Sequence, residues 1–218
     1  VLIITDLDSV IAPEEKLDDA TQASQDPGTS EDSRAARNGA GPCMTDTSGA
    51  HSANQTLIKW LPKERTIQGL LDAPSTSKIH QRTPDSLANI RVAYQTRQKV
   101  ETEFADLMLA GRTFEEAFAF ENLDYCRQEM GKVRQALRLW TERKDENPSP
   151  RQIIERIHER VKGSYFDKTE FALNLMMMEG WRTPAYIDEG LQWLEAELKP
   201  AVPDLIQPAL TSIEEGTS

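Results

Sequence analysis

The chain has 218 residues, of which 38% are hydrophobic and 6% aromatic, and its formal net charge is −11. No apolar run approaches the roughly 18 residues of a membrane-spanning helix, and two cysteines are too few for a disulfide-stabilised scaffold. The acidic balance argues against a basic, non-specific nucleic-acid binder. We therefore expect a cytoplasmic protein that has no membrane partner.

The charge divides the chain into three parts. Residues 1–55 carry ten acidic and three basic residues, residues 163–218 carry the same numbers, and the part between them is mildly basic. From residue 12 to residue 54, Ser, Thr, Asp, Gly and Pro dominate. So few apolar side chains would not offset an ordering entropy of about 1–2 kcal/mol per residue. We predict a disordered acidic head over residues 1–55, which starts with a short apolar segment.

The central part, residues 56–146, contains the start and stop signals of two long helices. Thr83 and Pro84 predict a helix start, and apolar residues three and four positions apart continue that helix to about residue 110. Thr113 and Glu116 form a Thr-x-x-Glu capping box, which predicts a second helix that ends near residue 144. The pattern fits a helical hairpin and a short coiled coil equally well.

Six apolar residues of the second helix keep a heptad-like spacing over nearly three heptads. In a coiled coil they would form the surface through which the chain self-associates, so we expect a homo-oligomer. These residues are Leu123, Cys126, Met130, Val133, Leu137 and Trp140.

Residues 147–200 contain start signals for three short helices. The signals are Ser149 before Pro150, Asp167 three residues before Glu170, and Thr183 before Pro184. They predict a three-helix bundle, followed by a flexible acidic tail over residues 201–218. The fold class that we expect is therefore all-α.

A run of methionines in this bundle predicts a surface for docking partners. Methionine is an adaptable apolar side chain, and three consecutive residues of a helix cannot all face one core. The candidate docking residues are Met176, Met177, Met178, Trp181 and Trp193.

The first residues contain one motif with catalytic meaning, Ile3-Ile4-Thr5-Asp6-Leu7-Asp8-Ser9-Val10. It resembles motif I of the haloacid-dehalogenase-like phosphatases, in which an apolar strand ends in Asp-x-Asp. The resemblance implies that Asp6 is a nucleophile and Asp8 an acid/base, with Mg²⁺ held beside them. It covers about nine residues, and we find no later strand that ends in Ser or Thr, no placed Lys and no strand-borne acidic pair. The phosphatase is therefore an alternative, and we expect a chain without catalytic residues or cofactor.

No spacing in the sequence favours a metal site. Glu155 and His158 have the Glu-x-x-His spacing of di-iron helical bundles, but such sites need two copies and further inward Glu residues. We interpret this pair as part of a solvated helix face. Cys43 and Cys126 lack a metal-ligand spacing and are interpreted as free thiols. We expect no metal ligand.

Nucleic-acid binding has little support in the sequence. Residues 176–198 could form a helix-turn-helix, but Asp188, Glu189 and Glu195 on its second helix would repel phosphate. An acidic surface suits a basic protein partner better. Residues 127–160 contain several arginines, and this is the only segment in which we expect even a weak contact with a nucleic-acid backbone.

The organisation predicts a non-catalytic interaction, scaffold, assembly or regulatory protein. It would self-associate through the central helices and dock protein partners through the C-terminal bundle. In layout, without a shared residue motif, the chain is similar to polymerase-cofactor phosphoproteins of negative-strand RNA viruses and to acidic phage assembly proteins.

Overall fold

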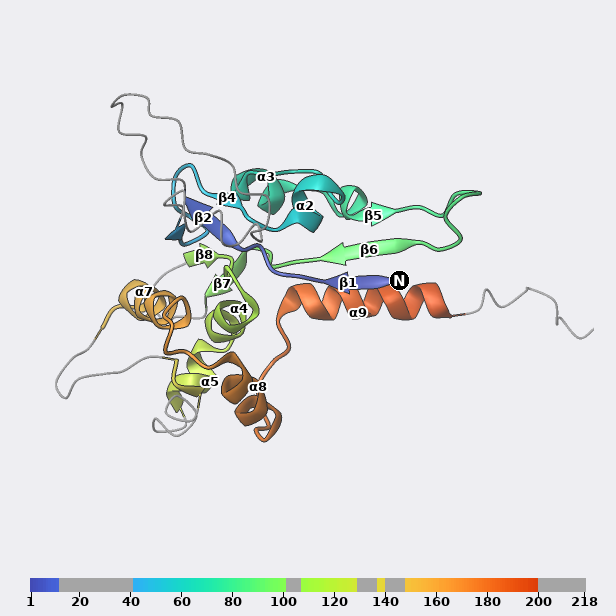
Figure 1. Cartoon of the computed structure of the whole chain (residues 1–218). Helices are drawn as coiled ribbons and strands as arrows, with labels where there is room; N and C mark the ends of the chain where they lie inside the picture. The colour runs from blue at the N-terminus through green and yellow to red at the C-terminus, as the bar shows by residue number, and fades with distance from the viewer. Residues whose placement is uncertain (12–40, 101–106, 129–136, 140–147, 200–218) are drawn as a thin grey trace, which may run out of the picture.

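The structure, a computed structural model, describes residues 1–11, 41–100, 107–128, 137–139 and 148–199 (Figure 1). These residues form both helices and sheets, so the prediction of an all-α fold is wrong. The predicted acidic tail, and residues 12–40 of the predicted head, lie outside the described residues.

The central sheet brings the N-terminus beside the middle of the chain. Strand β1 (Leu2–Ile4) pairs in parallel with β6 (Ile90–Ala93), and β5 (Ile79–His80) pairs antiparallel on the other side of β6. The strand order is β1-β6-β5. A parallel pair needs a long connection, which here is the whole segment between β1 and β6.

Helices cover both faces of this sheet (Figure 1). Helices α2 (Gln55–Lys59) and α3 (Ile67–Asp72) lie on one face, and α9 (Ala185–Leu198) lies along β1 and β6 on the other. The short 3-10 helix η1 (Ser75–Lys78) leads into β5.

Side-chain alternation explains why residues 90–93 form a strand rather than the predicted helix. Val92 packs into the cluster with α2 and α3, whereas its neighbour Ala93 packs against α9. Ile3 and Leu2 of the paired strand alternate in the same way. Successive side chains point to opposite faces in a strand, and both faces of this sheet are covered. The predicted helix over residues 83–110 is therefore wrong.

Two small antiparallel sheets complete the β structure among the described residues. In the first, β2 (Ser9–Ile11) lies between β3 (Gly41–Pro42) and β4 (His51–Ser52). The second is formed by β7 (Gln98–Val100) and β8 (Leu107–Leu109). The prediction of a disordered linker is thus wrong for the strands of residues 41–52, and the short apolar segment of residues 1–11, whose conformation the sequence left open, forms strands.

The helices α4 (Phe114–Glu121), α5 (Leu123–Gln128), α7 (Pro150–Val161) and α8 (Lys168–Met176) surround a second core. Phe118 lies at its centre, in edge contacts with the rings of Phe171 and Trp181 at centroid distances of 5.8 and 5.7 Å. Offset ring pairs of this kind add to the stabilisation from apolar burial.

The predicted coiled coil is also wrong. The second predicted helix breaks at Asn122, which separates α4 from α5 and whose amide Nδ2 donates to the carbonyl oxygens of Phe118 and Arg182. The heptad residues that the structure describes are fully buried in the chain's own core, and they are Leu123, Cys126 and Leu137. The others, Met130, Val133 and Trp140, lie outside the described residues.

The helix starts at Ser149 and Asp167 are confirmed, and the third helix begins at Ala185 with Pro184 rather than Thr183 at its cap, but the three-helix bundle is wrong. Ser149 and Gln152 form a reciprocal capping box with Pro150 at the first helical position, and the carboxylate of Asp167 caps α8. However, α7 packs against α4, while α9 packs against β1 and β6. The helical signals are local, whereas the partner of each apolar face depends on the tertiary structure.

Within the described part of the chain, no helix is long and apolar enough to cross a membrane.

Candidate functional site

The Asp-x-Asp motif lies at the edge where the two parallel strands end. Asp6 follows β1 by two residues, and Gln95 follows β6 by two residues. The amide of Thr5 donates to the carbonyl of Ala93 at 3.0 Å, which extends the strand pairing towards this edge. The carboxyl ends of parallel strands are where α/β sheets bind their ligands.

Gln95 connects the two strand ends through its side chain. Its Nε2 donates to Oδ1 of Asp6 at 2.5 Å, and its Oε1 accepts from the backbone amide of Leu7 at 2.8 Å. A third contact joins Nε2 to the hydroxyl of Tyr186 on α9 at 3.4 Å. Gln95 is fully buried, whereas Asp6 is only half-buried.

Two further side chains hold the backbone of the motif. Nδ2 of Asn54 donates to Oγ1 of Thr5 at 2.6 Å and to the carbonyl of Asp6 at 2.7 Å, while its Oδ1 caps α2. The hydroxyl of Ser52 donates to the carbonyl of Leu7 at 2.7 Å. The loop therefore has a defined conformation before any ligand binds.

Asp8 occupies the left-handed backbone region, with φ of 47°. Aspartate is among the few non-glycine residues that adopt this region readily. Its Oδ1 lies 3.8 Å from Nη2 of Arg112, and 41% of its side chain is exposed. Nε of Arg112 also donates to the carbonyl of Ser9 at 3.0 Å, so this cation is anchored to the strand that follows the motif.

The start of α4 completes the site. A Cβ at Gly111 would lie 2.2 Å from the backbone nitrogen of Ala117, so this turn requires glycine. The turn leads into Glu115, whose buried Oε2 forms an ion pair with Nζ of Lys168 on α8 at 3.3 Å. The helices α4 and α8 thereby add a carboxylate and a lysine to the site.

These charges act on Asp6. Burial is the main cause that raises the pKa of Asp6 above its ordinary value, and the negative charges of Asp8 and Glu115 raise it further. The hydrogen bond from Gln95 and the charge of Lys168 act in the opposite direction. Perturbed carboxyl groups of this kind mark candidate functional sites.

Behind the site, Glu116 forms a buried pair with His158 of α7. Nδ1 of His158 lies 2.9 Å from Oε1 of Glu116, while Oε2 of Glu116 accepts from the amide of Arg112 at 2.9 Å. Thr113 makes no capping hydrogen bond, so the predicted Thr-x-x-Glu capping box is wrong. The interpretation of His158 as part of a solvated face is wrong as well, whereas Glu155 does pair with Arg151 at the surface.

The predicted docking residues have different environments. Met176 and Met177 are 79% and 86% exposed, next to exposed Leu173. Met178 and Trp181 are partly buried against the helical core, and Nε1 of Trp181 donates to the carbonyl of Met178 at 3.0 Å. Trp193 is half-buried on α9.

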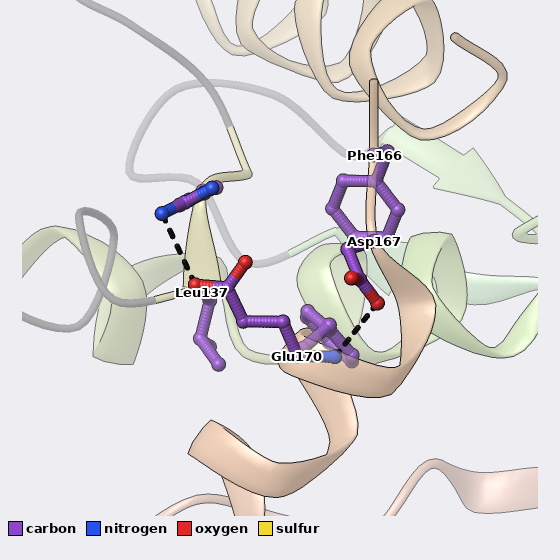
Figure 2. A pocket seen from close by; sticks show the side chains of 6 residues that line it. Leu137, Phe166, Asp167 and Glu170 are labelled. Atoms are coloured by element: carbon purple, nitrogen blue, oxygen red, sulfur yellow. Dashed lines mark hydrogen bonds and ion pairs between the residues drawn. The ribbon is translucent and has the colours of Figure 1, made fainter. Parts of the chain in front are cut away.

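A shallow hollow lies between residues 137–138 and the start of α8 (Figure 2). The figure shows the two interactions that satisfy its polar groups, Arg138 with Glu170 at 3.1 Å and the Glu170 amide with Asp167 at 2.9 Å. With room for about one water molecule, it is too small for a substrate.

Comparison with protein-family profiles, curated proteins and solved structures gives no match for this chain. Conclusions about its function therefore depend on the geometry of the site.

Sequence reasoning identified Asp6 and Asp8 but missed the groups around them. Gln95, Glu115 and Lys168 carry no motif, and they come from a strand end and two helix starts. Their proximity is a property of the fold. The sequence contains one local signal for these groups. The turn residue Gly111 comes just before a helix start that contains acidic residues.

Proposed function

We propose that the chain hydrolyses phosphate esters at the Asp6–Asp8 site, with the help of a divalent cation. The observation that carries this proposal is the position of Asp6, at the carboxyl end of a parallel strand pair and in contact with Gln95 of the neighbouring strand. The motif of the phosphatase alternative thus lies beside a parallel strand, β6, which the sequence analysis did not identify. The expectation of a chain without catalytic residues stays a prediction, and the assay below decides between the two.

The residues supply the charges that phosphoryl transfer needs. On the roles that the motif resemblance implies, the Asp6 carboxylate attacks phosphorus, and Asp8 gives its proton to the leaving oxygen. Asp8 then accepts a proton from the water that releases phosphate from Asp6. Arg112 and Lys168 lie near these carboxylates and offer positive charge to the phosphate oxygens.

A magnesium ion fits the donor chemistry of this site. Among the described residues, no group of three or more His, Cys, Asp or Glu side chains forms a ready-made metal cage. Magnesium, however, is commonly bound by one or two carboxylates, completed by waters and substrate phosphate. Asp6 and Asp8 would hold it, whereas the buried carboxylate of Glu115 is already paired with Lys168. The ion would neutralise charge on the phosphate oxygens.

The proposal is tested by hydrolysis of 4-nitrophenyl phosphate and bis(4-nitrophenyl) phosphate with and without Mg²⁺. We expect Asp6→Asn to lower kcat/KM by about 10³-fold or more, and Asp8→Asn by about 10²-fold or more. The matched control is Asp72→Asn, because Asp72 is a surface carboxylate that pairs with Arg97 and Gln68. Equal activity in wild type and Asp6→Asn would overturn the proposal.

The role of Asp6 is tested in a single turnover in H₂¹⁸O. Direct attack of water on the ester and hydrolysis of phosphorylated Asp6 at phosphorus both place ¹⁸O in the released phosphate, whereas hydrolysis at the carboxyl carbon places it in Asp6. A covalent phosphoryl group on Asp6, trapped by rapid acid quench, is expected for the monoester. Activity that requires Asp6 without any covalent species would contradict the nucleophile and leave Asp6 as a cation ligand or base.

A second candidate function is protein docking, which the exposure of Met176 and Met177 favours. Adjacent exposed methionines are an uncommon surface feature and suit an adaptable apolar contact. We expect Met176→Ser with Met177→Ser to weaken concentration-dependent association in sedimentation experiments while leaving phosphate-ester hydrolysis unchanged. Identical sedimentation of the wild type and this variant as monomers would contradict self-association through these residues.

We also infer a cytoplasmic location. Cys43 and Cys126 are free thiols, and burial raises the pKa of Cys126 to about 12. Unpaired thiols are typical of reducing compartments.

A further inference from the structure

We propose that Gln95 is a positioning residue of this site, whose side-chain amide holds the Asp6 carboxylate and the backbone of the Asp6–Asp8 loop in one geometry. The inference rests on the proposed function and adds to it a residue outside the motif. Gln95 is separated from Leu7 by 88 residues and from Asp6 by 89, so only the β1–β6 pairing brings them together.

The two ends of the amide are chemically different, and each meets the partner that it needs. Oε1 faces the N–H of Leu7, which can only donate, and Nε2 therefore faces Oδ1 of Asp6, which accepts. The reverse orientation would place two donors together and two acceptors together. The amide thus fixes both the rotamer of Asp6 and the backbone between the two aspartates.

Burial makes this arrangement effective. Gln95 is fully buried, so water does not compete for its hydrogen bonds. Its third contact, 3.4 Å to the hydroxyl of Tyr186, ties the amide to α9. Because α9 packs closely on the sheet at Gly190, the amide is held from a second element.

The length and polarity of glutamine are both required by this geometry. Asparagine is one methylene shorter, so Gln95→Asn cannot reach both partners. Gln95→Glu keeps the length but replaces the donor towards Asp6 with an acceptor, which repels the carboxylate. Tyr186→Phe leaves Gln95 in place and removes only its contact with α9.

The test compares these three variants with the wild-type full chain and with Gln68→Asn. Gln68 is the matched control because its amide also donates to an aspartate, Asp72, but at the surface. The first measurement is the amide ¹H–¹⁵N spectrum without metal or substrate, in which Leu7 and Asp8 report on the loop. The second is steady-state hydrolysis of 4-nitrophenyl phosphate, which separates kcat from KM.

We expect Gln95→Glu and Gln95→Asn to shift the Leu7 and Asp8 amide signals and to lower kcat by about 10- to 100-fold with little change in KM. Tyr186→Phe should lower kcat by about 3-fold, and Gln68→Asn should match the wild type. Tyr186→Phe also keeps the inference testable if a Gln95 variant does not fold.

The two proposals fail in different ways. Unshifted Leu7 and Asp8 signals in folded Gln95 variants would overturn the positioning role, whatever the activity. A wild-type chain that hydrolyses neither ester, while the variants shift these signals as expected, would overturn the proposed function and support the geometry of the inference. An increase in KM at constant kcat would show that Gln95 acts in substrate binding and would overturn the inference.

Discussion

At the scale of single residues, Asp6 lies at the end of a parallel strand, where burial disfavours its charged form. Its pKa is raised above the ordinary value of 3.8, mainly by burial and then by the neighbouring carboxylates. The folded state thus holds this proton more tightly than the unfolded chain does. The contribution of Asp6 to stability is therefore greatest when it is protonated at low pH, and it decreases as the pH rises from 3.8 through the folded-state pKa.

We expect Asp6→Asn to raise the free energy of unfolding at pH 7 by roughly 0.5–2 kcal/mol, in contrast to the loss of kcat/KM expected for the same variant. Asparagine still accepts the hydrogen bond from Gln95 and carries no charge. Urea unfolding of both proteins at pH 7 and pH 4 measures the effect, which should be smaller at the lower pH. A variant less stable than the wild type at pH 7 would contradict this account of Asp6.

The buried pair of Glu116 and His158 permits a second prediction at this scale. Replacement of His158 by Leu leaves Oε1 of Glu116 buried without its partner, which costs about 1–3 kcal/mol. His80→Leu is the control, since His80 lies half-buried on the short strand β5. Urea denaturation should show a loss for His158→Leu alone, and the second substitution Glu116→Gln should recover part of it. Equal stability of the two histidine variants would contradict the pair's importance.

At the scale of elements, local signals predicted helix starts well and the type of element less well. Ser149 and Asp167 act through hydrogen bonds within four residues, so the sequence contains the complete cause of those helix starts. In contrast, Ile90 and Val92 also fit a helical spacing of apolar residues. They form a strand because β1 supplies a hydrogen-bonding partner and helices cover both faces.

The turn before α4 permits a prediction for an element as a whole. Gly111→Ala places a Cβ against the backbone of α4, so either the turn or the helix must shift. We expect a loss of about 1–3 kcal/mol and reduced hydrolysis, because the same turn positions Arg112 and Glu115. Gly41→Ala is the matched control, since its Cβ would meet nothing within 4 Å. Thermal unfolding measures the difference, and similar midpoints for the two variants would contradict the close approach.

At the scale of the whole molecule, the N-terminal strand belongs to the central sheet. The amide of Thr5 bonds to Ala93, and that of Leu7 bonds to Gln95. We expect these amides to exchange with solvent about as slowly as those of β6, because they open only when the sheet opens. Hydrogen-exchange mass spectrometry of the full chain measures this, with the surface turn at residues 83–86 as the fast-exchanging reference. Complete exchange of residues 2–7 within seconds would contradict the sheet.

The candidate site was only partly predictable. The spacing of Asp6 and Asp8 after an apolar run is local and points to phosphate chemistry by resemblance. The proximity of Gln95 and Lys168 to Asp6 could not be derived from the sequence, because no periodicity relates them to Asp6. Their places depend on how β6 and α8 pack. In the sequence, a single Gln or Lys looks the same whether it lies at a site or elsewhere on the surface.

The sequence alone determined the C-terminal helix starts, the absence of a long apolar segment and the Asp-x-Asp motif. Each of these depends on residues close together in the chain, where capping, hydropathy and spacing act directly. Only the tertiary structure decided that residues 2–4 pair with residues 90–93 and that α7 and α9 pack on different partners. Those contacts join residues dozens of positions apart, and burial is favourable only when the opposite surface is present.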